Sequence, residues 1–158
     1  MYDADYWKST LGLEPHPEGG FYRRFFASPV SVRTEQGERP TMTAIHYLLE
    51  RGHYSAWHRL RSHELWHWHG GASALIHCIE NGRIVTHHLG GDSELTLTIE
   101  PHTWFAAEPD VDGDYLLVSC TVSPGFDFAD FEWGDVEALT AQHPESESLI
   151  RRLSRVPE

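Results

Sequence analysis

The residues best suited to chemistry in this sequence are histidines gathered in one short stretch. Ten of the twelve histidines lie between positions 46 and 102, and Glu64 lies in the middle of their densest group. Imidazole changes its protonation state near neutral pH and is also a common metal ligand. The stretch from position 52 to 71 therefore predicts either a proton-transfer site or a metal site. Five histidines fall within seventeen of its residues: His53, His58, His63, His67 and His69.

His58 and Glu64 are the pair that we predict to be catalytic. Alternate side chains of a strand point to the same side, which groups Tyr54 with His58, and Glu64 with Trp66 and Trp68. If both strands turn these faces inward, an imidazole and a carboxylate meet in an aromatic-lined pocket. Glu64 would then hold one ring nitrogen of His58 and leave the other to move a proton. The alternative is a buried hydrogen-bonded pair without a function.

A metal centre is the second interpretation of the cluster. Catalytic metal sites usually present three protein ligands, and His58 and Glu64 supply two. His46 on the preceding strand, or His67, would have to be the third. We therefore expect no cofactor, and the alternative is a metal held by His58, Glu64 and His46. The other histidines of the region are expected on solvated surface: His63, His69, His87, His88 and His102.

The segment from Glu18 to Arg24, Glu-Gly-Gly-Phe-Tyr-Arg-Arg, is a candidate for ligand binding. Paired glycines permit close backbone approach, and arginine can pair with a carboxylate or phosphate. The alternative is the start of an edge strand with a dimer contact. Aromatic side chains can stack on a ligand, although they also fill barrel cores. The residues expected to bind substrate are Glu18, Phe21, Tyr22, Arg24, His46, Tyr54, Trp66, His67, Trp68 and Phe105.

Short aromatic and β-branched segments, separated by turn signals, predict an all-β sandwich or barrel. Asn81-Gly82 between two apolar runs is typical of a type I′ turn, so residues 74–89 should form a hairpin. Helices are expected only at the two ends, one capped by Asp3 and two short ones around Pro144. Residues 37–40 look like a surface loop. The strand-like segments are 21–27, 41–49, 53–60, 64–69, 74–80, 83–89, 95–99, 103–107 and 115–122.

Composition disfavours several classes of function. The 158 residues are 40% hydrophobic, enough for one domain over 1–158. A formal net charge of −12 disfavours nucleic-acid polymers, because phosphate binding depends on clustered cations. The acidic start has no secretion-signal pattern and no apolar run is long enough for a bilayer. Cys78 and Cys120 lie in apolar runs, where a reduced thiol acts as a small hydrophobe. We expect a soluble cytoplasmic protein without membrane contact.

The spacing of Gly52, His58, Glu64 and Gly71 resembles the first cupin motif. That motif has a second histidine two residues after the first, where this sequence has Leu60. The second cupin motif is weaker still, because Thr103 and Ala106 stand at its glycine and histidine positions. Two of the four usual metal ligands of a cupin are therefore missing.

Three segments in order carry a closer resemblance. They are Leu13-Glu-Pro-His-Pro-Glu-Gly-Gly-Phe-Tyr-Arg, His58-Arg-Leu-Arg-Ser-His-Glu-Leu-Trp-His and Pro124-Gly-Phe-Asp-Phe-Ala-Asp-Phe. On these segments the chain resembles the cupin-5 family (DUF985) of the RmlC-like cupin superfamily, from about residue 11 to 153. The resemblance implies a double-stranded β-helix barrel, jelly-roll-like, with a short N-terminal helix and two short C-terminal helices. It also implies a homodimer and a pocket similar to that of cupin sugar-nucleotide epimerases.

Three functions fit these observations. The first is a metal-independent enzyme of the epimerase or isomerase type, acting on a sugar-like or carbonyl-containing small molecule with His58 as base and a pocket tyrosine as acid. The second is a module that binds a nucleotide or sugar without converting it. The third is a metal-dependent cupin oxygenase or isomerase, which the histidine density suggests.

Overall fold

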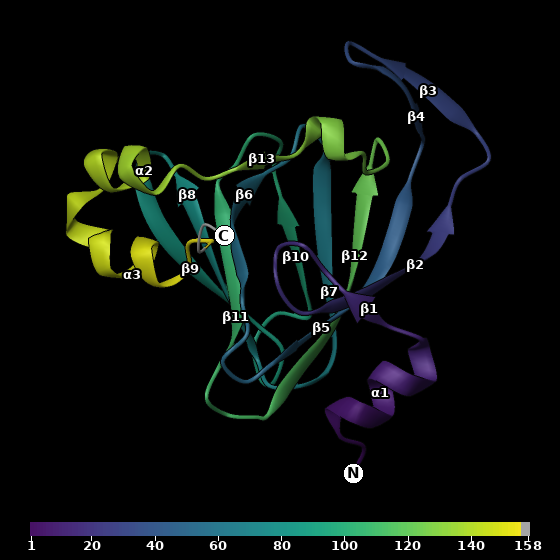
Figure 1. The fold of residues 1–158 in the computed structure, drawn as a ribbon, viewed down its shortest axis with the longest axis horizontal. Helices are drawn as coiled ribbons and strands as arrows, with labels where there is room; N and C mark the ends of the chain where they lie inside the picture. Colours follow the sequence, from purple (N-terminus) through teal and green to yellow (C-terminus); the bar gives the residue numbers. More distant parts are fainter. Residues whose placement is uncertain (156–158) are drawn as a thin grey trace.

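The alternating segments of the sequence form two antiparallel sheets that face each other in the computed structural model, which describes residues 1–155 (Figure 1). The first sheet has the order β1-β2-β5-β12-β7-β10. Its strands are β1 (Glu14–Pro15), β2 (Phe21–Ala27), β5 (Thr43–Glu50), β12 (Tyr115–Ser123), β7 (His63–Gly71) and β10 (Thr96–Ile99). The second sheet has the order β13-β6-β11-β8-β9. Its strands are β13 (Glu132–Trp133), β6 (Ser55–Arg59), β11 (Phe105–Pro109), β8 (Ala74–Glu80) and β9 (Arg83–Leu89).

The main core lies between the two sheets. Tyr47 and Trp66 from the six-stranded sheet pack with Phe105 and Ile76 from the five-stranded sheet, and all four are almost fully buried. Burying side chains of this size contributes roughly 1.5–3 kcal/mol each. The period-two alternation of the strands therefore decides which side chains face the barrel interior and which face outward.

The helices lie outside the two sheets, one at the N-terminus and two near the C-terminus. Helix α1 (Ala4–Leu11) begins at Asp3, whose side chain accepts from the Tyr6 amide, as predicted. Helices α2 (Val136–Gln142) and α3 (Glu147–Arg152) pack on the outer face of the five-stranded sheet (Figure 1). The short 3-10 segments are η1 (Phe128–Asp130) and η2 (Pro144–Ser146). None of the helices within residues 1–155 is long and apolar enough to span a membrane.

The predicted fold class is confirmed: this is an all-β, jelly-roll-like barrel with one N-terminal and two C-terminal helices. The predicted hairpin is also present, because β8 and β9 pair in register on either side of Asn81 and Gly82. Both turn residues have positive φ, 49° and 76°, as a type I′ turn requires.

The prediction of a surface loop at residues 37–40 is wrong. These residues form strand β4 (Gly37–Pro40), which pairs with β3 (Ser31–Thr34) in a separate two-stranded hairpin. Figure 1 shows this hairpin projecting from the sheets. Most of its side chains are exposed, so neither strand shows the apolar alternation by which the other strands were predicted.

Candidate functional site

A cavity of about 560 Å³ opens between the two sheets. Strands β2, β5, β7 and β12 of the six-stranded sheet line it, and β6 of the five-stranded sheet faces them. The segment after β12, residues 126–131, also contributes to the wall. Five ionisable side chains in the lining are largely removed from solvent: His16, Glu18, His58, Glu64 and Cys120.

His58 points a single ring nitrogen at a carboxylate of the cavity. Its Nδ1 lies 2.6 Å from the Ala56 carbonyl oxygen, which can only accept, so Nδ1 carries the proton and donates it. Its Nε2 lies 3.4 Å from Oε2 of Glu18. The ring is fixed by packing as well, because it stacks on Phe131 with the centroids 5.0 Å apart. This arrangement leaves Nε2 as the nitrogen that can accept a proton, with Glu18 placed to stabilise the resulting cation.

Glu18 is held by a tightly bonded loop that precedes β2. Its amide donates to Nδ1 of His16 at 3.0 Å, and its carbonyl oxygen accepts from the Ala56 amide at 3.2 Å. The Tyr47 hydroxyl donates to the carbonyl oxygen of Gly19. Burial lowers the pKa of His16, against the opposing effect of the Glu18 carboxylate. A neutral His16 therefore serves as the acceptor that positions Glu18.

Glu64 is a buried carboxyl group with one oxygen free of any protein partner. Oε1 accepts from Nε1 of Trp66 at 3.2 Å, whereas Oε2 has no hydrogen-bond partner. Burial, and after it the nearby negative charge of Glu18, raises the pKa of Glu64 to about 8. At neutral pH Glu64 is therefore mainly a neutral carboxylic acid in the wall of the cavity.

The mouth of the cavity combines cations with aromatic rings. Arg23 and Arg24 on β2 are exposed and line the cavity together with Phe126 and Phe128. A buried pair fastens this aromatic segment to the β3–β4 hairpin, since Arg39 Nε donates to Asp130 Oδ2 at 2.8 Å and Nη2 donates to Oδ1 at 3.1 Å. The lining thus combines cationic side chains with apolar surface.

The structure brings only some of the predicted site residues together. The cavity lining contains His58 and Glu64, both predicted to be catalytic, and Glu18, Tyr22 and Arg24, predicted to bind substrate. The other predicted residues lie elsewhere: Trp66, Trp68 and Phe105 in the core, Phe21 and Tyr54 at a separate hollow beside Gly52, and His46 and His67 on the outer face of the six-stranded sheet.

The predicted contact between Glu64 and His58 is replaced by two others. The Ala56 carbonyl holds the protonated nitrogen of His58, and Glu18 faces the second nitrogen. Glu64 instead accepts from Trp66. The two residues belong to strands of different sheets, β6 and β7, and both line the cavity without pairing side by side.

The donors at this cavity do not form a cupin-type metal site. His46 cannot join His58 and Glu64, because its neighbours Ile45 and Tyr47 face inward and it therefore faces outward. There its Nδ1 lies 3.2 Å from the Ser119 hydroxyl. Leu60 lines the cavity at the position of the second motif histidine. Among residues 1–155, no third donor converges with His58 and Glu64 at ligand spacing.

Two contributors to the site were not anticipated from the sequence. His16 positions the Glu18 loop, and Phe131 stacks on His58. Both lie within the segments that carry the closer family resemblance, the first between two prolines and the second at the end of an aromatic run. Their position in those segments was the available signal.

Two facing sheets around an open cavity are the architecture of the cupin fold. A cupin 2 conserved barrel domain protein from Rhodopseudomonas palustris has the same fold, with a TM-score of 0.58 and 17% identity over 90% of this chain and 86% of its own. More specifically, the chain belongs to the cupin-5 family: the family model described as "Cupin superfamily (DUF985)" matches residues 5–134.

Two solved structures are similar over the full length. A protein from Shewanella oneidensis is 36% identical, with a TM-score of 0.90 and complete coverage of both chains. A hypothetical protein from Leishmania major is 31% identical, with a TM-score of 0.89, over 98% of this chain and 100% of its own. No curated protein matches the sequence. The molecule is thus a cupin-fold protein with a cavity suited in size and lining to a small molecule.

Proposed function

We propose that this chain, as one cupin domain, is a metal-independent isomerase or epimerase acting on a sugar-like or carbonyl-containing small molecule. The observation that carries the proposal is the pairing, around one cavity, of a proton acceptor with a proton donor. His58 presents Nε2 beside Glu18, and Glu64 presents an unpartnered oxygen in its protonated state. A pair of ionisable groups, one kept protonated and the other unprotonated by its surroundings, is typical of acid–base catalysis.

In the proposed enolisation, one proton leaves the carbon next to the carbonyl and another is added to the carbonyl oxygen. His58 Nε2 takes the proton from the carbon next to the substrate carbonyl, and Glu18 stabilises the imidazolium. The electron pair of the broken C–H bond forms a C=C bond, and Glu64 donates its proton to the carbonyl oxygen. Return of a proton to carbon, with Glu64 recovering its own, completes an isomerisation or epimerisation. Glu64 thus takes the acid role for which the sequence suggested a tyrosine.

The cavity mouth supports a substrate with an anionic group. Arg24 is exposed on β2 at the opening, and arginine pairs with carboxylates and phosphates through two parallel hydrogen bonds. Phe126 and Phe128 beside it offer faces for a ring. We therefore propose a phosphorylated or carboxylated substrate whose carbonyl end reaches His58.

Hydrogen exchange in D₂O is the measurement that tests this function. Nucleoside-diphosphate sugars, sugar phosphates and short 2-hydroxy carbonyl acids are incubated with the protein, and loss of the carbon-bound proton next to the carbonyl is followed by NMR. We expect exchange with at least one compound. His58→Gln should slow that exchange by about 100-fold or more, the usual contribution of a general base.

The controls separate catalysis from binding and from folding. His63→Gln alters a histidine that is exposed and paired with Glu100 on the surface, and its exchange rate should match wild type. Circular dichroism verifies that each variant is folded. Wild-type exchange that persists unchanged in His58→Gln contradicts the catalytic role. Saturable binding with no exchange of any bound compound would identify a binding module instead.

We also propose that the chain forms the homodimer that the family resemblance implies, through the outer face of the six-stranded sheet. Helix α1 lies against one end of this face, where Lys8 pairs with Glu50, whereas α2 and α3 cover the other sheet. Phe25 and Phe26 are 50% and 41% exposed there, and Phe25 stacks on His46 with the ring centroids 4.2 Å apart. Exposed aromatic surface of this kind is typical of protein interfaces.

Replacing both phenylalanines by serine should convert the dimer to a monomer, because the substitution removes apolar area from the proposed interface. Light scattering coupled to size-exclusion chromatography gives the mass of each species. Val111→Ser serves as the control, because that side chain is 82% exposed in the β11–β12 loop. A wild-type mass of 18.1 kDa contradicts the dimer. The cytoplasmic location and the lack of nucleic-acid binding stay predictions from the sequence.

A further inference from the structure

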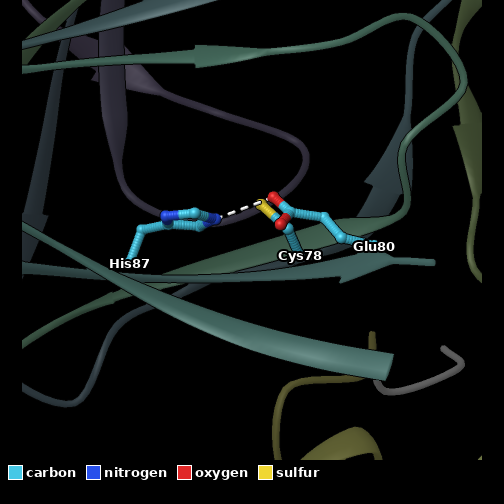
Figure 2. Close-up of side chains that lie close together, drawn as sticks. All are labelled: Cys78, Glu80 and His87. Carbon is cyan, nitrogen blue, oxygen red and sulfur yellow. Dashed lines mark hydrogen bonds and ion pairs between the residues drawn. The ribbon is translucent and has the colours of Figure 1, made fainter. Parts of the chain in front are cut away.

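Three side chains with metal-binding atoms meet on the β8–β9 hairpin, away from the cavity described above. They are Cys78 and Glu80 of β8 and His87 of β9, and one ligand atom from each lies within 4.8 Å of the other two. Figure 2 shows the thiol, the carboxylate and the imidazole converging. None of the three lines the cavity that contains His58.

The hairpin register fixes which residues share this face. Cys78 and Glu80 are two apart on one strand and therefore point the same way. His87 pairs with Ile76, which shares that face with Cys78. The tight turn at Asn81-Gly82 joins the two strands directly, so the backbone that carries all three ligands is continuous and short. Such a site requires little rearrangement before an ion binds.

We propose that Cys78, Glu80 and His87 bind a divalent transition-metal ion, with Zn²⁺ as the best match, and that water completes the coordination. A thiolate, an imidazole and a carboxylate are the donors that Zn²⁺ takes in proteins, in tetrahedral geometry. The thiolate disfavours Mg²⁺ and Ca²⁺, which prefer oxygen ligands. Three protein ligands leave the fourth position open.

The distance between the imidazole and the carboxylate fits an ion after a small adjustment. His87 Nε2 lies 2.7 Å from Glu80 Oε1, a direct ion-pair or hydrogen-bond contact. Ligand bonds of about 2.0–2.3 Å in tetrahedral geometry place donor atoms roughly 3.3–3.6 Å apart. The imidazole and carboxylate therefore need to separate by less than an ångström. Both side chains are partly exposed, 31% and 41%, so each can rotate by that amount.

The cost opposing the site is deprotonation of the thiol. Burial, followed by the charges of Glu80 and Glu64, raises the pKa of Cys78 to about 12. A bound cation has to displace that proton, and it compensates by coordinating the sulfur and neutralising the nearby carboxylate. The alternative explanation is a cross-strand ion pair beside a core thiol. That explanation predicts no effect of the thiol on metal binding, and the two accounts therefore differ in experiment.

Cobalt substitution tests the proposal on the full-length protein without a histidine tag. Co²⁺ bound through a thiolate gives a sulfur-to-metal charge-transfer absorption band. We expect this band at one equivalent of Co²⁺, and its displacement by Zn²⁺. Cys78→Ser should abolish the band, while His87→Gln and Glu80→Gln should each weaken Zn²⁺ affinity by more than about 100-fold, beyond the effect of changing an outer-shell group.

Matched controls come from neighbouring residues. Cys120→Ala removes the other buried cysteine and should retain the band. His88→Gln alters the adjacent exposed histidine and should retain full affinity. Zn²⁺ should raise the midpoint of thermal unfolding of wild type and not that of His87→Gln, because only a ligand that binds the folded state stabilises it. A band that is missing in wild type, or present in Cys78→Ser, overturns the proposal. Failure of the hydrogen-exchange test at His58 leaves it unaffected.

Discussion

Glu64→Gln is expected to stabilise the protein at alkaline pH by up to about 5 kcal/mol and to change its stability little at pH 5. The carboxyl group is buried, and its pKa is raised from 4.5 to about 8 in the folded protein. Between these values the folded chain binds a proton that the unfolded chain releases. The stability that this proton contributes is therefore fully present below pH 4.5, falls as the pH rises from 4.5 to 8, and is lost above pH 8. Glutamine has the shape of the neutral acid and cannot ionise, so the variant does not lose stability in this range.

Thermal unfolding measured from pH 5 to pH 9 checks this expectation. At pH 9 the midpoint of Glu64→Gln should exceed that of wild type by on the order of 10 °C, given the usual relation between stability and midpoint for a domain of this size. Glu35→Gln is the control, because Glu35 is exposed in the turn between β3 and β4. Parallel curves for wild type and Glu64→Gln would show that Glu64 is ionised in the folded protein. Infrared spectroscopy reports the same state directly, as a carboxylic-acid carbonyl band that Glu64→Gln removes.

Strands with side-chain alternation or a tight turn were predictable from the sequence, and the β3–β4 hairpin was not. Segments 21–27, 74–80 and 83–89 coincide with β2, β8 and β9. In each, side-chain alternation or a tight turn gives a local signal. The β3–β4 hairpin is polar and mostly exposed, so its pairing depends on contacts that no local pattern reports. Its link to the site, Arg39 with Asp130, joins residues 91 positions apart.

The candidate site was predicted in its members more than in its contacts. His58 and Glu64 share the cavity because each lies on the inward face of its strand, which alternation predicts. Which carboxylate meets Nε2 of His58 depends on the path of the loop before β2. That loop brings Glu18 to within 3.4 Å of a ring forty residues further along the chain. Spacing along one strand carries no information about such a contact.

The sequence signal for the cluster on β8 and β9 lies in the register of the hairpin. Once Asn81-Gly82 is accepted as a two-residue turn, Glu80 pairs with Arg83, Cys78 with Val85, and Ile76 with His87. A thiol, a carboxylate and an imidazole on one face follow from that register alone. Taken singly, His87 is expected on solvated surface and Cys78 as a small hydrophobe, and only the hairpin register places them together.

Gly19→Ala should have the largest effect of any single methyl group added near the site. Gly19 has φ +108°, and a Cβ there would lie 2.1 Å from the carbonyl oxygen of Tyr54. Because that neighbour is backbone, the loop has to move away from β6. We expect a loss of about 3 kcal/mol or more in the free energy of unfolding, from backbone strain and steric overlap together.

The displaced loop also carries Glu18, so Gly19→Ala should separate this carboxylate from His58 and lower both ligand affinity and hydrogen exchange. Gly82→Ala is the matched control: its φ is +76°, but a Cβ there meets nothing within 4 Å. It should cost only about 1–2 kcal/mol, the backbone penalty alone. Urea denaturation of the two variants measures the difference. Equal losses in the free energy of unfolding would mean that the loop is free to shift. The position of Glu18 would then not depend on the close approach of Gly19 and Tyr54.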